Sequence, residues 1–245
     1  MVGNIELIDD TWLANILNRP VYRLNFDPVG DDFSTLKKMI YQAVQNVEGK
    51  EIFIHTRVPT VSLMSCRVVE ALGFELMDTN VVFDKPAESK PHQVEPFILQ
   101  FAKKSHHEAC RKLAGSCFDR SRFHLDPKIP NELANCIMSE WAGNFFAGGR
   151  GEWMVVALSN TEVVGFLQLL RRGTDTLLVD LIGVDSNYRR QGIAEAMIRF
   201  AERECKRFVK VIVGTQVANI SSVRLYERLG FRIRSSQYIY HYHGI

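Results

Sequence analysis

The segment VDSNYRRQGIA at residues 184–194 constrains the fold of this chain more than any other part of its sequence. It follows the apolar segment TLLVDLIGV and precedes residues with amphipathic helical spacing, which predicts a strand–loop–helix unit. At such a helix start, open backbone N–H groups and the small residues Gly192 and Ala194 allow a pyrophosphate to approach the main chain closely. Arg189 and Arg190 add positive charge. The alternative is an ordinary helix start beside two solvated arginines.

A second pattern, NISSVRLYERLGF, occupies residues 219–231. Together with the first segment, in this order and at this separation, it resembles the two cofactor signatures of the GNAT superfamily of acetyl-CoA-dependent N-acetyltransferases. The superfamily pattern N-x-x-A-x-x-x-Y-x-x-x-G-F is matched at Asn219, Tyr226, Gly230 and Phe231. Two residues depart from the usual signatures, because Ser222 replaces alanine and Ser186 replaces a common proline.

The resemblance implies an acetyl-CoA site in the second half of the chain. By resemblance, the main chain of residues 182–184 pairs with the pantetheine arm like an added strand, the loop after it holds the pyrophosphate, and Asn219 hydrogen-bonds the arm. A backbone N–H of this strand is also placed to polarise the thioester carbonyl. The residues expected to contact the cofactor are Ile182, Gly183, Val184, Arg189, Arg190, Gln191, Gly192, Ile193, Ala194, Asn219 and Ser222.

Tyr226 is the expected general acid. A phenol with an ordinary pKa of about 10 is protonated at neutral pH and can donate to a departing thiolate, whose conjugate acid titrates near about 8.5. The alternative is a half-buried tyrosine that only packs its helix. Asp180, on the preceding strand, is either a general base directed at the acceptor or a structural partner of a nearby basic group. A neutral amine needs only water to accept its second proton, so transfer does not require a base.

Composition limits the partners of the chain. It has 245 residues, of which 46% are apolar, and 30 basic residues against 28 acidic ones give a formal net charge of +2. This balance provides no basic footprint for nucleic acid or a membrane surface. The five cysteines are irregularly spaced, which favours a reduced compartment and no metal site. With neither a signal peptide nor an apolar span of about 18 residues, the chain is expected to be cytoplasmic.

Periodicity and turn residues predict an α/β (α+β) chain with a mixed, twisted sheet flanked by helices. We expect a smaller, partial GNAT-like domain at 1–84, a polar linker at 85–93 and a catalytic GNAT domain at 94–245. In the first domain, strands are expected at 21–26, 51–56 and 74–83, with helices at 34–47 and 61–72. The second domain is expected to follow the order β-α-α-β-β-β-α-β-α-β and to end in a strand pair.

A short internal similarity relates the two halves. Aligning the LGF tripeptides sets residues 65–85 against residues 222–242, each a helix that ends at glycine and enters a strand. The alternative is that helix–glycine–strand turns often look alike. If the repeat is genuine, the first half has lost the chemistry, because Val69 stands where the second half has Tyr226.

The stretch RSRFHLDP at 120–127, with the tryptophan-containing helix after it, narrows the choice of acceptor substrate. With the overall layout, it resembles the TDP-fucosamine acetyltransferases, which N-acetylate a nucleotide-linked 4-amino-4,6-dideoxy sugar for bacterial surface polysaccharide. Such a ligand suits charge-assisted bonds and aromatic contacts. The candidate diphosphate ligands are Arg120 and Arg122, and the candidate base or sugar contacts are Phe123, His124 and Trp141. Alternatively, Phe123 and Trp141 belong to the core, and Arg120 and Arg122 are solvated or cap a helix. His124 is then either a general base or a residue with a structural role.

Two other functions remain open from sequence. One is a GNAT enzyme for another amine, such as an aminoglycoside, a polyamine or a protein N-terminus, although no carboxylate cluster suggests a polyamine site. The other is a non-catalytic acetyl-CoA-binding module, which the retention of Tyr226 with Asn219 disfavours. A homodimer through the C-terminal sheet is a family-level expectation.

Overall fold

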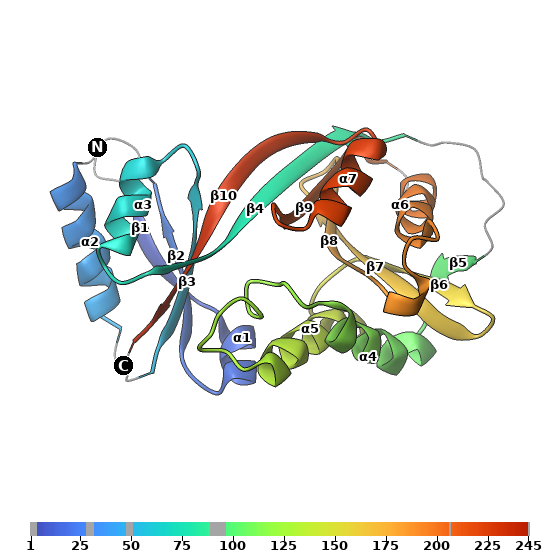
Figure 1. Ribbon diagram of the computed structural model, residues 1–245, viewed down its shortest axis with the longest axis horizontal. Coiled ribbons are helices and arrows are strands. Elements are labelled where there is room, and N and C mark those ends of the chain that lie inside the picture. The colour runs from blue at the N-terminus through green and yellow to red at the C-terminus, as the bar shows by residue number, and fades with distance from the viewer. Residues whose placement is uncertain (1–3, 28–31, 48–50, 89–96, 206, 245) are drawn as a thin grey trace.

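The computed structural model describes residues 4–27, 32–47, 51–88, 97–205 and 207–244. Its strands form one mixed sheet in the order β1-β2-β3-β10-β4-β9-β8-β7-β6-β5, with helices on both faces (Figure 1). The strands are β1 (Ile5–Asp9), β2 (Val21–Phe26), β3 (Phe53–Pro59), β4 (Glu75–Pro86), β5 (Ile98–Phe101), β6 (Trp153–Ser159), β7 (Glu162–Arg172), β8 (Thr176–Val184), β9 (Lys210–Gln216) and β10 (Arg232–His243). The predicted α/β class is confirmed.

The helices begin and end where the sequence provides caps and apolar spacing. In α2, Asp32 caps the first turn, and Leu36, Ile40 and Val44 form one buried stripe at four-residue intervals. The helices are α1 (Thr11–Leu17), α2 (Phe33–Gln45), α3 (Leu63–Glu70), α4 (His107–Cys117), α5 (Asn131–Phe146), α6 (Ile193–Glu204) and α7 (Ile220–Arg228), with 3-10 turns at η1 (Lys104–His106) and η2 (Ser186–Tyr188). Among the described residues, none of these helices has the length and apolar character that a membrane crossing requires.

The second half follows the predicted order of elements, with one correction. The expected final strand pair is wrong, because β10 is one strand of 12 residues. Its polar stretch stays paired with β4 and accommodates a register shift between Ile233 and Ser235 in place of a turn, and β3 pairs with β10 from Gln237 onward. In the first half, β1 and α1 were not predicted. Pro28 and Gly30, residue types that favour a turn after the first of the predicted strands, lie outside the described residues.

The internal repeat is present in the fold. Gly73 and Gly230 have φ angles of +87° and +86°, each where a helix turns into a long strand. The offset between these two glycines maps β3 onto β9, and β4 onto β10, residue for residue. The strand registers agree, since the pairing of Pro59 with Gln237 corresponds to that of Gln216 with Asn80. The two halves are therefore structural copies over these elements.

The two copies exchange their last strands. β10 lies between β3 and β4, and β4 in turn lies between β10 and β9, so both strands arch across the junction (Figure 1). Asn80 pairs with its own repeat equivalent, Gln237, which places a local two-fold relation at this point of the sheet. β4 also continues to Pro86, two residues into the segment expected to be a linker, and residues 89–93 of that segment lie outside the described residues.

Apolar cores on both faces hold the sheet. In the first half, α2 and α3 cover one face, and the core there includes Leu36, Ile40 and Val69. In the second half, the core that includes residues of α6 and α7 also receives Val81 and Phe83 from β4. The second half therefore builds part of its core from residues before position 84.

Candidate active site

Strands β8 and β9 separate partway along their length. Their parallel pairing covers only Thr176–Val179 with Lys210–Val213, whereas β8 continues to Val184 and stays paired with β7 on its other side. The backbone at 182–184 therefore has no strand partner on the β9 side within the described structure. An extended arm that carries amide groups fits there, because it can take up the hydrogen bonds of a missing strand.

The N-terminus of α6 lies next to this separation. Gly192 is its N-cap with φ +83°, and no side chain caps the helix. The first N–H groups of an α-helix have no acceptor within the helix, and they favour an anion. Arg190, at φ +64°, and Gly192 both adopt the left-handed backbone that shapes this loop. A pyrophosphate suits the loop on these grounds.

Arg189 is turned toward the protein backbone. Its guanidinium donates to the carbonyl oxygens of Val184 at 3.2 Å and Cys117 at 2.8 Å, and so ties the ends of β8 and α4 together. Gln191 likewise donates from its side chain to the carbonyl of Asn187 at 3.4 Å. In this geometry the side chains of Arg189 and Gln191 brace the loop, while Ile193 is buried beneath the helix.

Tyr226 lies on α7 with only 1% of its surface exposed. Its ring packs against Phe83 at 5.8 Å and Phe231 at 5.7 Å, measured between ring centroids. Burial raises the pKa of the Tyr226 phenol, and the Ser222 hydroxyl opposes that shift only in part. The phenol is therefore protonated at neutral pH, as a proton donor must be.

Asn219 is the N-cap of α7. Its Oδ1 accepts from the backbone N–H of Ser222 at 3.2 Å and from the Ser221 hydroxyl at 2.8 Å. The carbonyl end of the side chain is thus used within the helix cap, and the amide NH₂ end is the part suited to a ligand acceptor.

Asp180 has the geometry of a structural partner. Its Oδ2 accepts from Trp141 Nε1 at 2.8 Å, and Arg150 binds both carboxylate oxygens at 2.7 and 2.6 Å. Gln168 adds a fourth hydrogen bond at 3.2 Å, and the Asp180 side chain is only 4% exposed. These bonds occupy the carboxylate, so of the two readings from sequence the geometry favours the structural one over the base.

Some side chains of the RSRFHLDP stretch are exposed to solvent, and others are buried in the core. Arg120 is exposed and lies 4.0 Å from Asp119, whereas Arg122 is half-buried with its guanidinium 4.4 Å above the ring of Phe123. Phe123 itself is 1% exposed within an apolar cluster with Ile129 and Ile137. Of the two interpretations of Phe123 from sequence, the geometry favours the core, because its ring is buried and Arg122 lies over one of its faces.

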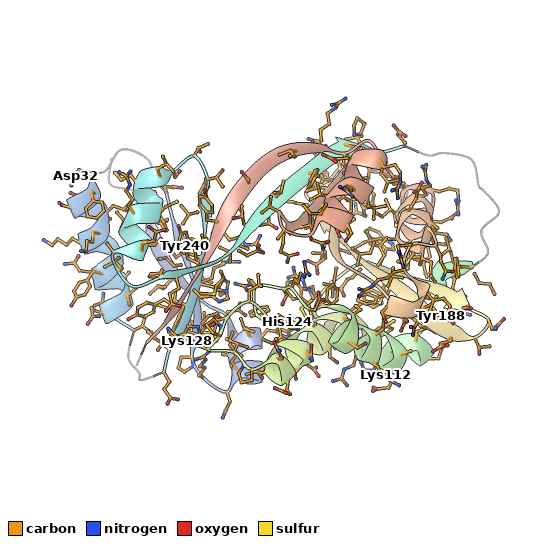
Figure 2. The ribbon with its side chains drawn as sticks, in the orientation of Figure 1. Asp32, Lys112, His124, Lys128, Tyr188 and Tyr240 are labelled. Carbon is orange, nitrogen blue, oxygen red and sulfur yellow. The ribbon has the colours of Figure 1, made fainter. Side chains whose placement is uncertain are left out.

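His124 and Trp141 have protein partners. The two ring nitrogens of His124 contact Ser121 Oγ at 2.7 Å and Asn135 Oδ1 at 2.9 Å, which fixes the loop against the start of α5 (Figure 2). Both nitrogens are thus occupied, and the role of His124 as a base is not supported by its contacts. Trp141 packs edge-on against Trp12 at 6.0 Å, so α1, which the sequence did not predict, contributes to this region.

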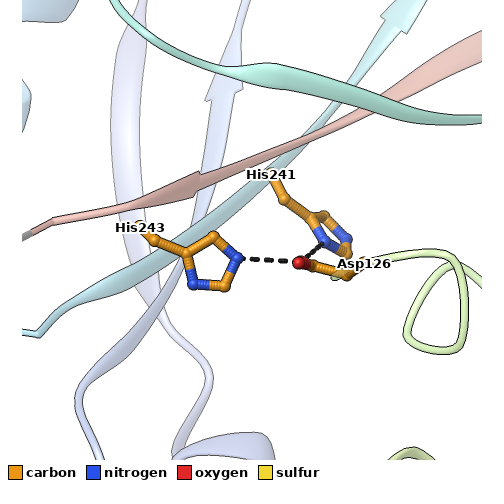
Figure 3. Close-up of side chains that lie close together, drawn as sticks. All are labelled: Asp126, His241 and His243. Carbon is orange, nitrogen blue, oxygen red and sulfur yellow. Dashed lines mark hydrogen bonds and ion pairs between the residues drawn. The ribbon is translucent and has the colours of Figure 1, made fainter. Parts of the chain in front are cut away.

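A buried cluster of one aspartate and two histidines, which the sequence did not predict, joins the loop between α4 and α5 to β10. Asp126 Oδ2 accepts from His241 Nδ1 at 2.7 Å and from His243 Nε2 at 2.8 Å (Figure 3). Arg122 Nη1 lies 3.5 Å from the other nitrogen of His241, so a cationic group already lies beside this cluster and disfavours a metal ion there. Two histidines separated by one residue on a strand were the available signal, because such residues share a face.

The charge states of this group follow from burial. Burial lowers the pKa of His241 to about 4, against an opposing effect of Asp126. Burial would raise the pKa of Asp126, but the hydrogen bonds from His241 and His243 outweigh it and hold that pKa well below its usual range. A neutral His241 therefore donates from Nδ1 to an ionised Asp126 and accepts at Nε2 from Arg122.

A strand separation beside an uncapped helix start, with a protonated tyrosine on the next helix, is an arrangement that suits an acyltransferase using a coenzyme A thioester. The model of the Acetyltransferase (GNAT) family matches residues 108–231. The chain belongs to this family and is an acetyl-CoA-dependent acyltransferase.

Similar proteins cover almost the whole chain. It is 29% identical over 238 residues to the spore coat polysaccharide biosynthesis protein SpsD of Bacillus subtilis (strain 168), across 95% of this chain and 81% of that protein. A GCN5-related N-acetyltransferase from Sphaerobacter thermophilus matches with a TM-score of 0.62 at 14% identity, covering 100% of this chain and 78% of that one. A tandem GNAT protein from the clavulanic acid biosynthesis pathway matches with a TM-score of 0.62 at 10% identity, covering 99% and 79%.

Proposed function

We propose that this protein transfers an acetyl group from acetyl-CoA to the primary amine of a nucleotide-linked amino-deoxy sugar used in surface polysaccharide synthesis. The separation of β8 from β9 beside the uncapped start of α6 carries the proposal for the cofactor. For the acceptor, the support is a relative that matches nearly the full length and whose name concerns spore coat polysaccharide biosynthesis.

The residues divide the chemistry among them. When bound, acetyl-CoA supplies an acetyl thioester, and the free backbone at 182–184 orients it while the N–H groups from Gly192 onward hold its pyrophosphate. The amine nitrogen forms a bond to the thioester carbonyl carbon, and the carbon–sulfur bond breaks. Tyr226 donates a proton to the departing sulfur, and the nitrogen loses its extra proton to water. Because burial raises the pKa of Tyr226, the phenol keeps its proton until negative charge develops on the sulfur, and after the transfer it regains a proton from water.

Thiol release from acetyl-CoA tests this function. The acceptor panel contains TDP-linked 4-amino and 3-amino deoxy sugars, a polyamine, an aminoglycoside and a peptide, each measured at equal concentration. We expect turnover only with a TDP-amino sugar. Turnover with one of the other amines and none with the sugars contradicts the proposed acceptor while leaving the acetyltransferase assignment in place.

A further inference from the structure

The first-half sheet turns a charged face toward the catalytic half. Arg23 pairs in register with His55, and Arg57 shares a row with Ile239 and Asp78 across β3, β10 and β4. Residues opposite one another in a sheet lie on the same face, as do alternate residues of one strand. The other face holds the apolar core under α2 and α3, so the charged residues point away from those helices.

Three parts of the fold meet at this charged face. Arg57 interacts electrostatically with Arg150 and Asp180, which belong to the site beside the strand separation. Arg122, on the loop between α4 and α5, interacts with both Arg57 and Asp78. The first-half sheet, the loop and the catalytic site therefore lie within electrostatic range of one another.

Arg57 and Arg122 lie on the same face of the sheet, because Arg122 Nη1 is 3.5 Å from His241 and Arg57 pairs with Ile239, two residues before His241 on β10. Neither arginine forms a salt bridge within the described residues; the charge of Arg57 acts on Arg122, and the charges of Arg23 and Arg150 act on Arg57. Arg57 is exposed to solvent, and Phe123 supports the Arg122 guanidinium on one face. Burial, together with the nearby positive charge of Arg57, lowers the pKa of Arg122. Two guanidinium groups so placed form a region that favours an anion.

The carboxylates near the two arginines are hydrogen-bonded to other groups. Asp126 accepts from two histidines, and Asp180 is bound on both oxygens by Arg150. Asp10 accepts from the backbone N–H of Leu13 at 3.1 Å and contacts His55 at 3.3 Å. Asp78 accepts from the backbone N–H of Thr79 at 2.7 Å. Apart from the Arg122 Nη1 contact with His241, the protein thus leaves the donors of Arg57 and Arg122 for an outside anion.

We propose that Arg57 and Arg122 together bind the phosphate groups of the acceptor, so that the first half of the chain is part of the acceptor site. This inference rests on the proposed function, which gives the acceptor a diphosphate. Planar guanidinium groups match phosphate oxygens with paired, charge-assisted hydrogen bonds. The location also suits the acceptor, because Arg57 interacts electrostatically with Arg150 and Asp180, which lie beside the strand separation.

Calorimetric binding tests the inference with the full-length protein at one fixed salt concentration and saturating coenzyme A, which fills the cofactor loop. The probes are dTDP, inorganic pyrophosphate and thymidine. We expect Arg57→Gln and Arg122→Gln each to weaken dTDP binding by about 10- to 100-fold, with the affinity for coenzyme A unchanged. Arg67→Gln, on α3 behind the apolar face, is the matched control and retains wild-type affinity.

The outcomes separate the inference from the proposed function. Equal dTDP affinity in the wild type and Arg57→Gln overturns the inference, as does binding of thymidine as tight as that of dTDP, because the base would then carry the recognition. Pyrophosphate binding that weakens in parallel in both variants supports the phosphate as the ligand. If the wild type acetylates a TDP-amino sugar and Arg57→Gln does so with an unchanged KM, the function stands and the arginine assignment fails. If no TDP-amino sugar reacts, the proposed acceptor is contradicted. The phosphate-binding role of Arg57 and Arg122 is then tested by dTDP binding alone.

Discussion

At the scale of single residues, Tyr226 carries the clearest chemical prediction. Replacing Tyr226 with phenylalanine keeps the ring that packs on Phe83 and Phe231 and removes only the hydroxyl. We expect kcat to fall by about 100-fold or more, since general acid catalysis contributes roughly 10²- to 10⁴-fold, while acetyl-CoA binds as before. Steady-state turnover and calorimetric binding measure the two effects.

The matched control is Tyr240→Phe in the first-half core. Its hydroxyl donates to Glu70 at 2.8 Å, far from the proposed chemistry, so its loss lowers the free energy of unfolding by about 1 kcal/mol and leaves kcat unchanged. Full turnover by Tyr226→Phe, or an equal loss of kcat in both variants, contradicts the acid role.

Close packing around β8 leaves no room for a side chain at Gly183. A Cβ at this position would lie 2.6 Å from Cys117 Sγ and 2.7 Å from the Phe166 ring. We expect Gly183→Ala to lower the free energy of unfolding by roughly 1–3 kcal/mol, as overpacked cores do. Urea unfolding measures the change. In Gly115→Ala the nearest atoms are 3.5 Å away, so this helical control is expected to be neutral or slightly stabilising.

The positions of the proposed site differ in how well sequence could predict them. The cofactor loop and the cap of α7 are local patterns, so spacing alone placed Gly192 and Asn219 at helix starts. The role of Phe123 depended on which distant elements would cover it, and sequence could not decide between a ligand and the core. Arg57 gave no signal at all, because it reaches the catalytic half only through strand exchange.

At the scale of elements, two buried histidines on the paired strands β10 and β3 make the free energy of unfolding depend on pH. Burial lowers the pKa of His241, on β10, to about 4 and that of His55, on the adjacent β3, to about 3, against an ordinary value of 6.5. The unfolded chain therefore takes up protons that the folded chain refuses once the pH falls below about 6.5. Stability is retained above that pH and is lost as the pH falls toward 4.

The expected slope is roughly 1.4 kcal/mol per pH unit for each histidine that remains neutral in the folded state. Urea unfolding at pH 8, 7, 6 and 5 measures it. His241→Gln removes one of the two groups, so its stability should depend less steeply on pH over the same range. A free energy of unfolding that stays flat between pH 7 and 5 contradicts the neutral, buried state of both histidines.

The same elements mark the limits of sequence prediction. Strands such as β2 and β8 have compact apolar runs between turn signals, and their bounds were predicted to the residue. β10 was divided in two because its polar stretch resembles a turn, whereas pairing with β4 keeps that stretch extended. α1 is short and follows β1 directly, and its packing against α5 arises from tertiary contact with Trp141.

At the scale of the whole molecule, the exchange of β4 and β10 makes each half depend on the other. Removing residues 1–84 takes away β3 and nearly all of β4, which leaves both edges of β10 and one edge of β9 unpaired. It also removes Val81 and Phe83 from the core around Tyr226. Unpaired strand edges promote aggregation, and loss of buried aromatic packing lowers stability.

We therefore expect a chain of residues 94–245 to aggregate or to remain unfolded, even though it contains both cofactor motifs. Size-exclusion chromatography with light scattering and circular dichroism measure this directly. Co-expression with residues 1–93 should restore a soluble, equimolar complex that binds acetyl-CoA, because the two fragments can still exchange their last strands. A folded and active monomer of 94–245 alone would show that the second half is self-sufficient, and then the exchanged strands would contribute little to the catalytic fold.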